Sequence, residues 1–315
     1  MTKWITVVAF ALVLLLGCST QTAPAPYAIT NANQLQERGV ALYERGEYSD
    51  AIMYFSRAAS EYQSLNQQEK LLVAQQNMAE AAFLVAQYEF SEHAAAVALK
   101  LATEQGDSAS KVRASLTLAR VYIAQQKYLQ AQKEISIIQA ALVDERNRMR
   151  KAPRDWSALE RSALLTLAQF TLLTEPQNTQ WLEQANQPSL FADNPLYHAR
   201  YLRLIYAQKQ HVNALEQALS IYTSQGFRPG IATCLEALAA HYSTLEQKED
   251  ALNTYRRALY VRLALNDAHH THFNLMALSA LYEEMEQPEV AIQYRELAQR
   301  LVSNTRIMTE IRDAL

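Results

Sequence analysis

The sequence is poor in the residues that interrupt helices. Its 315 residues include only six glycines and eight prolines, and it lacks runs of alternating valine, isoleucine and threonine. Alanine, leucine, glutamine, glutamate and arginine, which favour helices, are abundant instead. We therefore predict an all-α fold.

Cysteine is scarce and neither sign of charge is in large excess. The chain has two cysteines, Cys18 and Cys234, and 29 basic residues against 32 acidic ones. If Cys18 is modified as described below, Cys234 is left without a disulfide partner inside the chain, so stability must come from helix packing. Because the chain as a whole is not basic, we expect no nucleic-acid partner.

Familiar catalytic signatures are missing too. The sequence contains no glycine-rich phosphate loop, no Cys-x-x-Cys, no His-Glu-x-x-His and no Gly-x-Ser-x-Gly. Cys234 and His241 share a predicted helix face, but two turns separate them by about 10 Å, beyond the contact distance of a nucleophile and its base. We interpret both as packing residues and predict a non-enzymatic protein without a cofactor or a small-molecule substrate.

Three closely spaced histidines are the best candidate metal ligands. They are His269, His270 and His272, beside Asp267. A metal site needs three or four convergent ligands, and the cluster lies at a predicted turn between repeats. We favour a solvated helix start over a metal site.

The first 20 residues differ from the rest of the chain. Lys3 precedes an apolar run over residues 4–16, which is too short for the roughly 20 residues of a membrane span. The run ends in Leu15-Leu16-Gly17-Cys18, which resembles the lipobox of bacterial lipoproteins, although Leu16 is bulkier than usual. A plain secretory signal with an incidental cysteine is the alternative.

The lipobox resemblance implies an address for the protein. Residues 1–17 would be a cleaved signal peptide, and Cys18 would receive acyl chains such as palmitate. Residues 18–33, rich in Ser, Thr, Ala and Pro, would be a flexible tether. Ser19 stands where inner-membrane lipoproteins often have Asp, which favours the periplasmic face of the outer membrane.

Similar residues recur at intervals of 40 positions. One series of small residues is Ala58, Ala98, Ala218, Ala258 and Ala298, and a second is Gly39, Ala79, Ala119, Ala199, Ala239 and Ser279. A third series consists of Gly or Asn: Asn66, Gly106, Asn186, Gly226 and Asn266. Small residues allow helices to approach closely, and Gly or Asn ends helices in the left-handed conformation. The spacing predicts a stack of helical hairpins.

The best-preserved repeats resemble the tetratricopeptide repeat. The first has Gly39, Leu42, Tyr43, Gly46, Tyr48, Ala51, Phe55 and Ala58. The resemblance implies a right-handed α-solenoid of about seven repeats over residues 34–311. The period of 40 exceeds the usual 34 and predicts helices of about 17 residues.

Two repeats depart from the pattern. The fourth is degenerate, because Pro176, Pro188 and Pro195 divide it into short helices. The third has Arg146 where Gly or Asn is expected, so its second helix should run on toward Pro153. The basic cluster there could contact anionic lipid or an acidic partner, although a solvated helix end is favoured; it comprises Arg146, Arg148, Arg150, Lys151 and Arg154.

The resemblance also indicates a binding surface, since the first helix of each tetratricopeptide pair lines a concave groove. The corresponding residues are Tyr43, Gln76, Phe83, Arg113, Arg120, Arg200, Arg203, Glu236, Phe273 and Met276. They would either bind a peptide, carboxylates included, or only cover the inner surface. We predict a membrane-anchored scaffold that binds an envelope protein or peptide. The alternatives are a ligand-responsive regulator, or an accessory factor of a secretion, pilus or peptidoglycan-synthesis machine.

Overall fold

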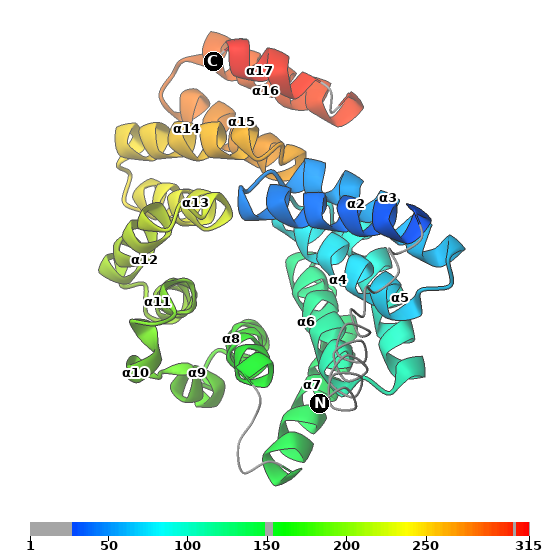
Figure 1. Ribbon diagram of the computed structural model, residues 1–315. Coiled ribbons are helices and arrows are strands. Elements are labelled where there is room, and N and C mark those ends of the chain that lie inside the picture. Colours follow the sequence, from blue (N-terminus) through cyan, green and yellow to red (C-terminus); the bar gives the residue numbers. More distant parts are fainter. Residues whose placement is uncertain (1–26, 149–153, 305–306, 315) are drawn as a thin grey trace, which may run out of the picture.

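The protein is a solenoid of stacked helices. The computed structural model describes residues 27–148, 154–304 and 307–314. All regular structure in these ranges is helical, which confirms the predicted fold class. Successive helices lie against one another, and the stack curves around a common centre (Figure 1). The predicted signal peptide, Cys18 and most of the predicted tether lie outside the described residues.

Helices of 16 to 18 residues dominate, as the repeat period predicts. The first half of the chain contains α2 (Tyr27–Glu44), α3 (Tyr48–Ser64), α4 (Gln68–Leu84), α5 (Tyr88–Gln105), α6 (Ser108–Ala124) and α7 (Tyr128–Arg148). The middle contains α8 (Arg154–Thr174), α9 (Gln180–Ala185), α10 (Pro188–Phe191), α11 (Pro195–Lys209) and α12 (Val212–Ser224). The last part contains α13 (Arg228–Thr244), α14 (Lys248–Ala264), α15 (Ala268–Glu284), α16 (Pro288–Ser303) and α17 (Met308–Ala314).

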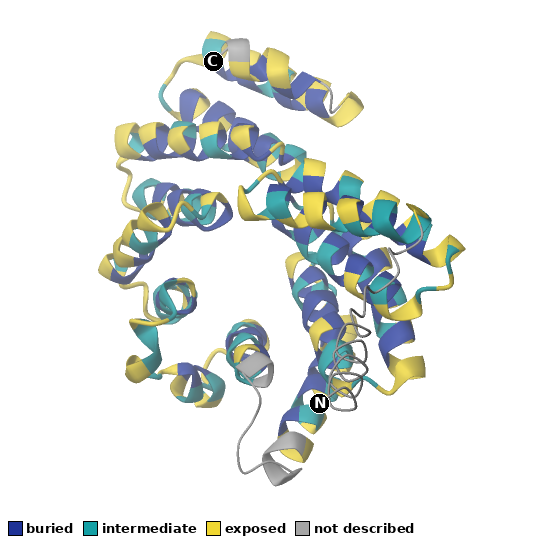
Figure 2. Cartoon of the chain, in the orientation of Figure 1, coloured by how far each residue is buried: buried dark blue, intermediate teal, exposed yellow. Residues whose placement is uncertain are grey.

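The series of small residues lie where helices touch. All five alanines of the first series have no exposed surface, and the second series is buried as well. In Figure 2, buried residues form stripes along the helices. At Gly39 a Cβ atom would lie 2.6 Å from the ring of Phe55, so that ring needs a glycine opposite it. Close helix contact explains the repeated small residues.

The turns contain two periodic sets of left-handed residues. The set between repeats includes Asn66, Gly106, Gly226 and Asn266, as predicted, whereas Asn186 has a φ of −74°. A second set lies within the repeats, again 40 positions apart: Gly46, Ala86, Gln126, Glu246 and Glu286. Sequence reasoning missed this second set, because four of its five members are neither Gly nor Asn.

Ala86 provides a test of this turn geometry. Its φ of 55° is costly for a residue with a Cβ, so Ala86→Gly is expected to raise the free energy of unfolding by about 1 kcal/mol. The control is Ala96→Gly on the exposed surface of α5, which should lower it by about 1 kcal/mol. Denaturant unfolding measures both, and a similar loss in the two variants would contradict the left-handed assignment.

The two ends of the solenoid differ from the predicted boundaries. Helix α2 begins at Tyr27, inside the predicted tether, and its Ala32 is fully buried. Past residue 304, Ile307, Met308 and Ile311 pack into the core of the last repeats. Helix α17 therefore covers apolar surface that the final repeat would otherwise expose.

The middle of the chain breaks the regular pattern as predicted. The prolines at 188 and 195 begin α10 and α11, and α9 and α10 have only six and four residues. Helix α7 continues past Arg146 to Arg148, so the repeat lacks its usual turn there. The side chains of the predicted basic cluster lie outside the described residues.

The last repeats return to contact the first. Leu265 belongs to a buried cluster whose other fully buried members lie between residues 42 and 118. The rings of Tyr88 and His269 lie 5.5 Å apart. A Cβ atom at Gly46, between α2 and α3, would lie 3.6 Å from the side chain of Arg228 in α13, and Figure 1 shows this end of the α2–α3 pair beside α13. We call this junction of the α2–α5 region with the α13–α15 region the seam; it closes the solenoid around its inner face.

Candidate functional site

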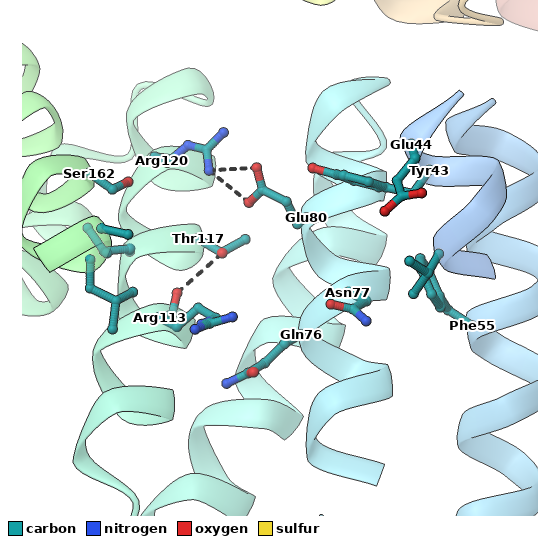
Figure 3. Close-up of a pocket in the computed structure, with 14 residues that line it drawn as sticks. Tyr43, Glu44, Phe55, Gln76, Asn77, Glu80, Arg113, Thr117, Arg120 and Ser162 are labelled. Carbon is teal, nitrogen blue, oxygen red and sulfur yellow. Dashed lines mark hydrogen bonds and ion pairs between the residues drawn. The ribbon is translucent and has the colours of Figure 1, made fainter. Parts of the chain in front are cut away.

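The inner face contains two adjoining cavities. The first has a volume of about 500 Å³ and is lined by residues of α2, α3, α4, α6 and α8 (Figure 3). The second has a volume of about 340 Å³. It is lined by residues of α2, α4, α5, α6 and α8, and by residues from α11 to α15. Tyr43, Glu80 and Arg120 line both cavities. The two cavities therefore adjoin at these three residues.

The first cavity combines apolar walls with polar groups. Leu116 and Leu159 are apolar lining residues from α6 and α8. Gln76, Asn77 and Arg113 add amide and guanidinium groups (Figure 3). Such a surface can pack an apolar side chain and also donate hydrogen bonds to peptide carbonyls.

An ion pair stands where the cavities meet. Arg120 Nη1 donates to both carboxylate oxygens of Glu80, at 2.9 and 2.8 Å. The guanidinium carbon of Arg120 lies 4.0 Å from the centre of the Phe83 ring. These contacts with Glu80 and Phe83 fix the Arg120 side chain against α4. Tyr43 lines both cavities as well, and burial and the charge of Glu80 raise the pKa of its hydroxyl, which is therefore neutral and able to donate.

The second cavity contains two further arginines from one face of α11. Arg200 Nη2 donates to Thr166 Oγ1 at 3.0 Å, which is a neutral partner. Burial, together with the positive charges of Arg120 and Arg203, lowers the pKa of Arg200 to about 9. Glu80 opposes this shift, but its two oxygens already accept from Arg120. The site therefore holds positive charge that the protein only partly balances.

A buried charge network lies beside this cavity and next to the seam. Arg262 is 3% exposed and forms two hydrogen bonds to Glu236, of 2.8 and 2.7 Å, and one to Asp267, of 3.1 Å. Asn274 donates to Glu236 and His270 contacts Asp267. Arg262 and His270 also line the second cavity. The network joins the cavity wall to the turn between α14 and α15.

Seven of the ten predicted groove residues come together around the two cavities. They are Tyr43, Gln76, Phe83, Arg113, Arg120, Arg200 and Arg203. The carboxylate of Glu236 is occupied by Arg262 and Asn274, and Phe273 and Met276 line neither cavity. Sequence reasoning missed Glu80, whose position 40 residues before Arg120 could have suggested a partner from the neighbouring repeat.

The other candidate residues have structural contacts. Cys234 is fully buried, which raises the pKa of its thiol to about 11, and His241 lies against the Tyr206 ring. The three clustered histidines have different partners: His269 meets Tyr88, His270 meets Asp267, and His272 meets the Ala298 carbonyl. Within the described ranges, no three or more His, Cys, Asp or Glu side chains are arranged so that they could hold a metal ion. No described helix has both the length and the hydropathy to cross a membrane.

Comparison with known proteins identifies the fold but not a family. No family model and no curated protein matches the chain. A solved Rap conjugation gene regulator of plasmid pLS20, in complex with the Phr* peptide, aligns with a TM-score of 0.65 and 12% identity, over 93% of this chain and 81% of that one. The apo form of RapI aligns with a TM-score of 0.61 and 12% identity, over 83% of this chain and 92% of that one. Both are helical repeat proteins of the tetratricopeptide type, and this chain shares their fold.

Proposed function

We propose that the protein is a non-enzymatic scaffold that binds a protein segment or peptide in its two adjoining cavities. The observation that supports this most directly is the inner site itself, where apolar side chains, aromatic rings and arginines line two adjoining cavities. A preformed site of this kind lowers the ordering cost of binding. The pLS20 regulator with a similar fold was solved with a peptide bound, which is consistent with this function.

Photo-crosslinking in cells tests this proposal. A photoreactive residue at Gln169 in the second cavity should trap a specific polypeptide. The same residue at Lys133, exposed on α7, is the control and should not trap it. Equal labelling from both positions, or no labelled polypeptide from Gln169, would count against the inner site as the binding surface.

We further propose that the scaffold is tethered beneath the outer membrane by lipid on Cys18. The support is the lipobox-like sequence before Cys18. Two or three acyl chains on one residue are enough for durable attachment. In this arrangement the lipid fixes the location and the solenoid supplies the contacts to an envelope partner.

Cys18→Ala is expected to release the protein from membranes. The substitution removes the thiol that would be acylated, so the protein should move from the membrane pellet to the soluble fraction after cell lysis. Cys234→Ala is the matched control, because it removes a buried thiol that is not part of the lipobox-like sequence, and this variant should remain in the pellet. Continued sedimentation of the Cys18→Ala protein would refute the anchor.

A ligand-responsive regulator is a second candidate function. Three residues that line the second cavity favour it, namely Tyr88, Arg262 and His270. Tyr88 contacts His269 across the seam, and Arg262 and His270 both contact Asp267 in the adjoining charge network. A ligand that contacts these residues could change how firmly the first and last repeats hold together. Small-angle scattering with and without the trapped polypeptide would decide, since identical profiles would exclude this function.

A further inference from the structure

Building on the proposed binding function, we propose that the inner site selects peptide segments with acidic side chains at two or more separated positions. Arg200 and Arg203 would receive one carboxylate, and Arg113 would receive another. An apolar residue between them would pack against Leu116 and Leu159. The ligand is therefore an acidic peptide segment rather than an arbitrary polypeptide.

The distribution of charge is the first argument. The chain has a net charge of −3, yet the two cavities together are lined by five arginines against two carboxylates, Glu44 and Glu80. Two of them are neutralised within the protein, Arg120 by Glu80 and Arg262 by Glu236 and Asp267. Among the described residues, no carboxylate lies within ion-pair distance of Arg113, Arg200 or Arg203. A local excess of cations in an acidic protein indicates an anionic ligand.

The environment of Arg200 is the second argument. Arg200 is partly buried beside the positive charges of Arg120 and Arg203, and its guanidinium donates a hydrogen bond to Thr166. A cation held in this way is costly until an anion approaches. A carboxylate can accept two parallel hydrogen bonds from a guanidinium, and charge-assisted bonds of this type are the stronger ones. Arg203 is three residues away on the same helix face and can share that carboxylate.

The spacing of the arginines is the third argument. Arg113 and Arg120 are two turns apart on α6, about 10 Å along the helix, and Arg200 and Arg203 approach from α11. A single terminal carboxylate cannot reach arginines spread over both cavities. Acidic side chains at separated positions can. Leu116 stands between Arg113 and Arg120 on α6 and lines the first cavity, which fits an apolar residue flanked by acidic ones.

A nucleic acid would also supply anions, but the site does not suit one. Proteins that bind phosphate backbones present basic residues along an open surface. Here Arg113, Arg200 and Arg203 line two cavities of about 500 and 340 Å³. We therefore assign the site to peptide carboxylates, and an oligonucleotide serves as a competitor in the test.

Selection from a library of short random peptides on the purified full chain tests the proposal. The retained peptides should be enriched in Asp and Glu at two or more positions with an apolar residue between them. Selected peptides, resynthesised with a fluorescent label, should bind in solution more weakly as salt concentration rises. Replacing their acidic residues by Asn and Gln should reduce affinity on the order of tenfold or more, as expected for lost charge-assisted hydrogen bonds.

Variants of the protein provide the matched arm. Arg200→Gln combined with Arg203→Gln should reduce affinity for the acidic peptides on the order of tenfold or more. The control combines Lys133→Gln with Lys209→Gln, which removes the same net charge from exposed positions outside the two cavities. It should change affinity less than about twofold, because screened surface charges contribute little.

The possible outcomes separate this inference from the proposed function. If the retained peptides show no enrichment in acidic residues, and they no longer bind when Ser162→Trp fills the first cavity, the acidic selectivity is wrong but the binding function stands. Dependence on a free C-terminus, or preferential displacement by a single-stranded oligonucleotide, would also overturn it. If the wild-type protein retains no peptide more strongly than the Ser162→Trp variant does, that result counts against both proposals.

Discussion

Replacing Arg262 with methionine is expected to lower the free energy of unfolding by about 3–5 kcal/mol. Arg262 is 3% exposed, and its guanidinium is shared between Glu236 and Asp267, whose side chains are 11% and 0% exposed. Removing it leaves two carboxylates in a buried setting without their main counter-charge. Methionine keeps much of the side-chain volume, so the effect should come from charge rather than from a cavity. Denaturant unfolding measures the change.

Arg300→Met is the control for this experiment. Arg300 pairs with Glu310 on the surface, and both side chains are more than half exposed. Surface pairs of this kind are worth less than about 1 kcal/mol, so the control should be nearly neutral. Equal losses in the two variants would show that the buried network has no special role in stability.

The same network makes stability depend on pH. Burial alone would raise the pKa of Asp267, but the hydrogen bonds and charge of His270, with the charge of Arg262, hold it below its usual range. The unfolded state therefore binds a proton more readily than the folded state does. Stability from Asp267 is present above the ordinary aspartate pKa and is lost as pH falls below it. Asp267→Asn should flatten this acid limb of the stability profile; an unchanged limb would contradict the assignment.

Replacing Leu265 with alanine is expected to lower the free energy of unfolding by about 2–5 kcal/mol and to loosen the solenoid. Leu265 follows α14, and its buried cluster otherwise comes from the first three repeats, including Leu42 and Ile52. Truncating the side chain removes apolar contact across the seam. Small-angle scattering should then show a larger radius of gyration, because the first and last repeats are held less tightly.

Leu259→Ala separates the two effects. Leu259 is 1% exposed and packs within the last repeats, so its truncation should cost similar stability. It lies away from the seam cluster and should leave the radius of gyration unchanged. Similar dimensions for both variants and the wild-type protein would contradict the role of Leu265 in closing the solenoid.

Local regularities in the sequence predicted most of the repeat structure. Alanine recurs at the repeat position of Ala98 and Ala258 because each helix pair must approach closely. Gly or Asn recurs at the repeat position of Asn266, where a helix ends in the left-handed conformation. The turn at Ala86 escaped notice because alanine gives no sign of a left-handed backbone. The turn keeps this left-handed backbone despite a cost of about 1 kcal/mol.

The candidate site was predicted less completely. The repeat pattern located Arg113, Arg120, Arg200 and Arg203 on first helices, and the structure places them around the two cavities. The same pattern also named Glu236, which is occupied by Arg262 from the adjoining helix of the same repeat pair. A repeat position indicates which way a side chain points but not which neighbour it meets.

The sequence by itself determined the helices, the repeat period and the close contacts within each layer, because these depend on residues a few turns apart. Only the tertiary structure decided that Leu265 meets the first repeats and that Arg200 lies near Arg120. Each repeat is rotated slightly relative to the one before it, and these rotations accumulate along the chain. The short helices between α8 and α11 change the accumulated rotation. Contacts across the seam and the inner cavities therefore depend on the whole path of the solenoid rather than on any single repeat.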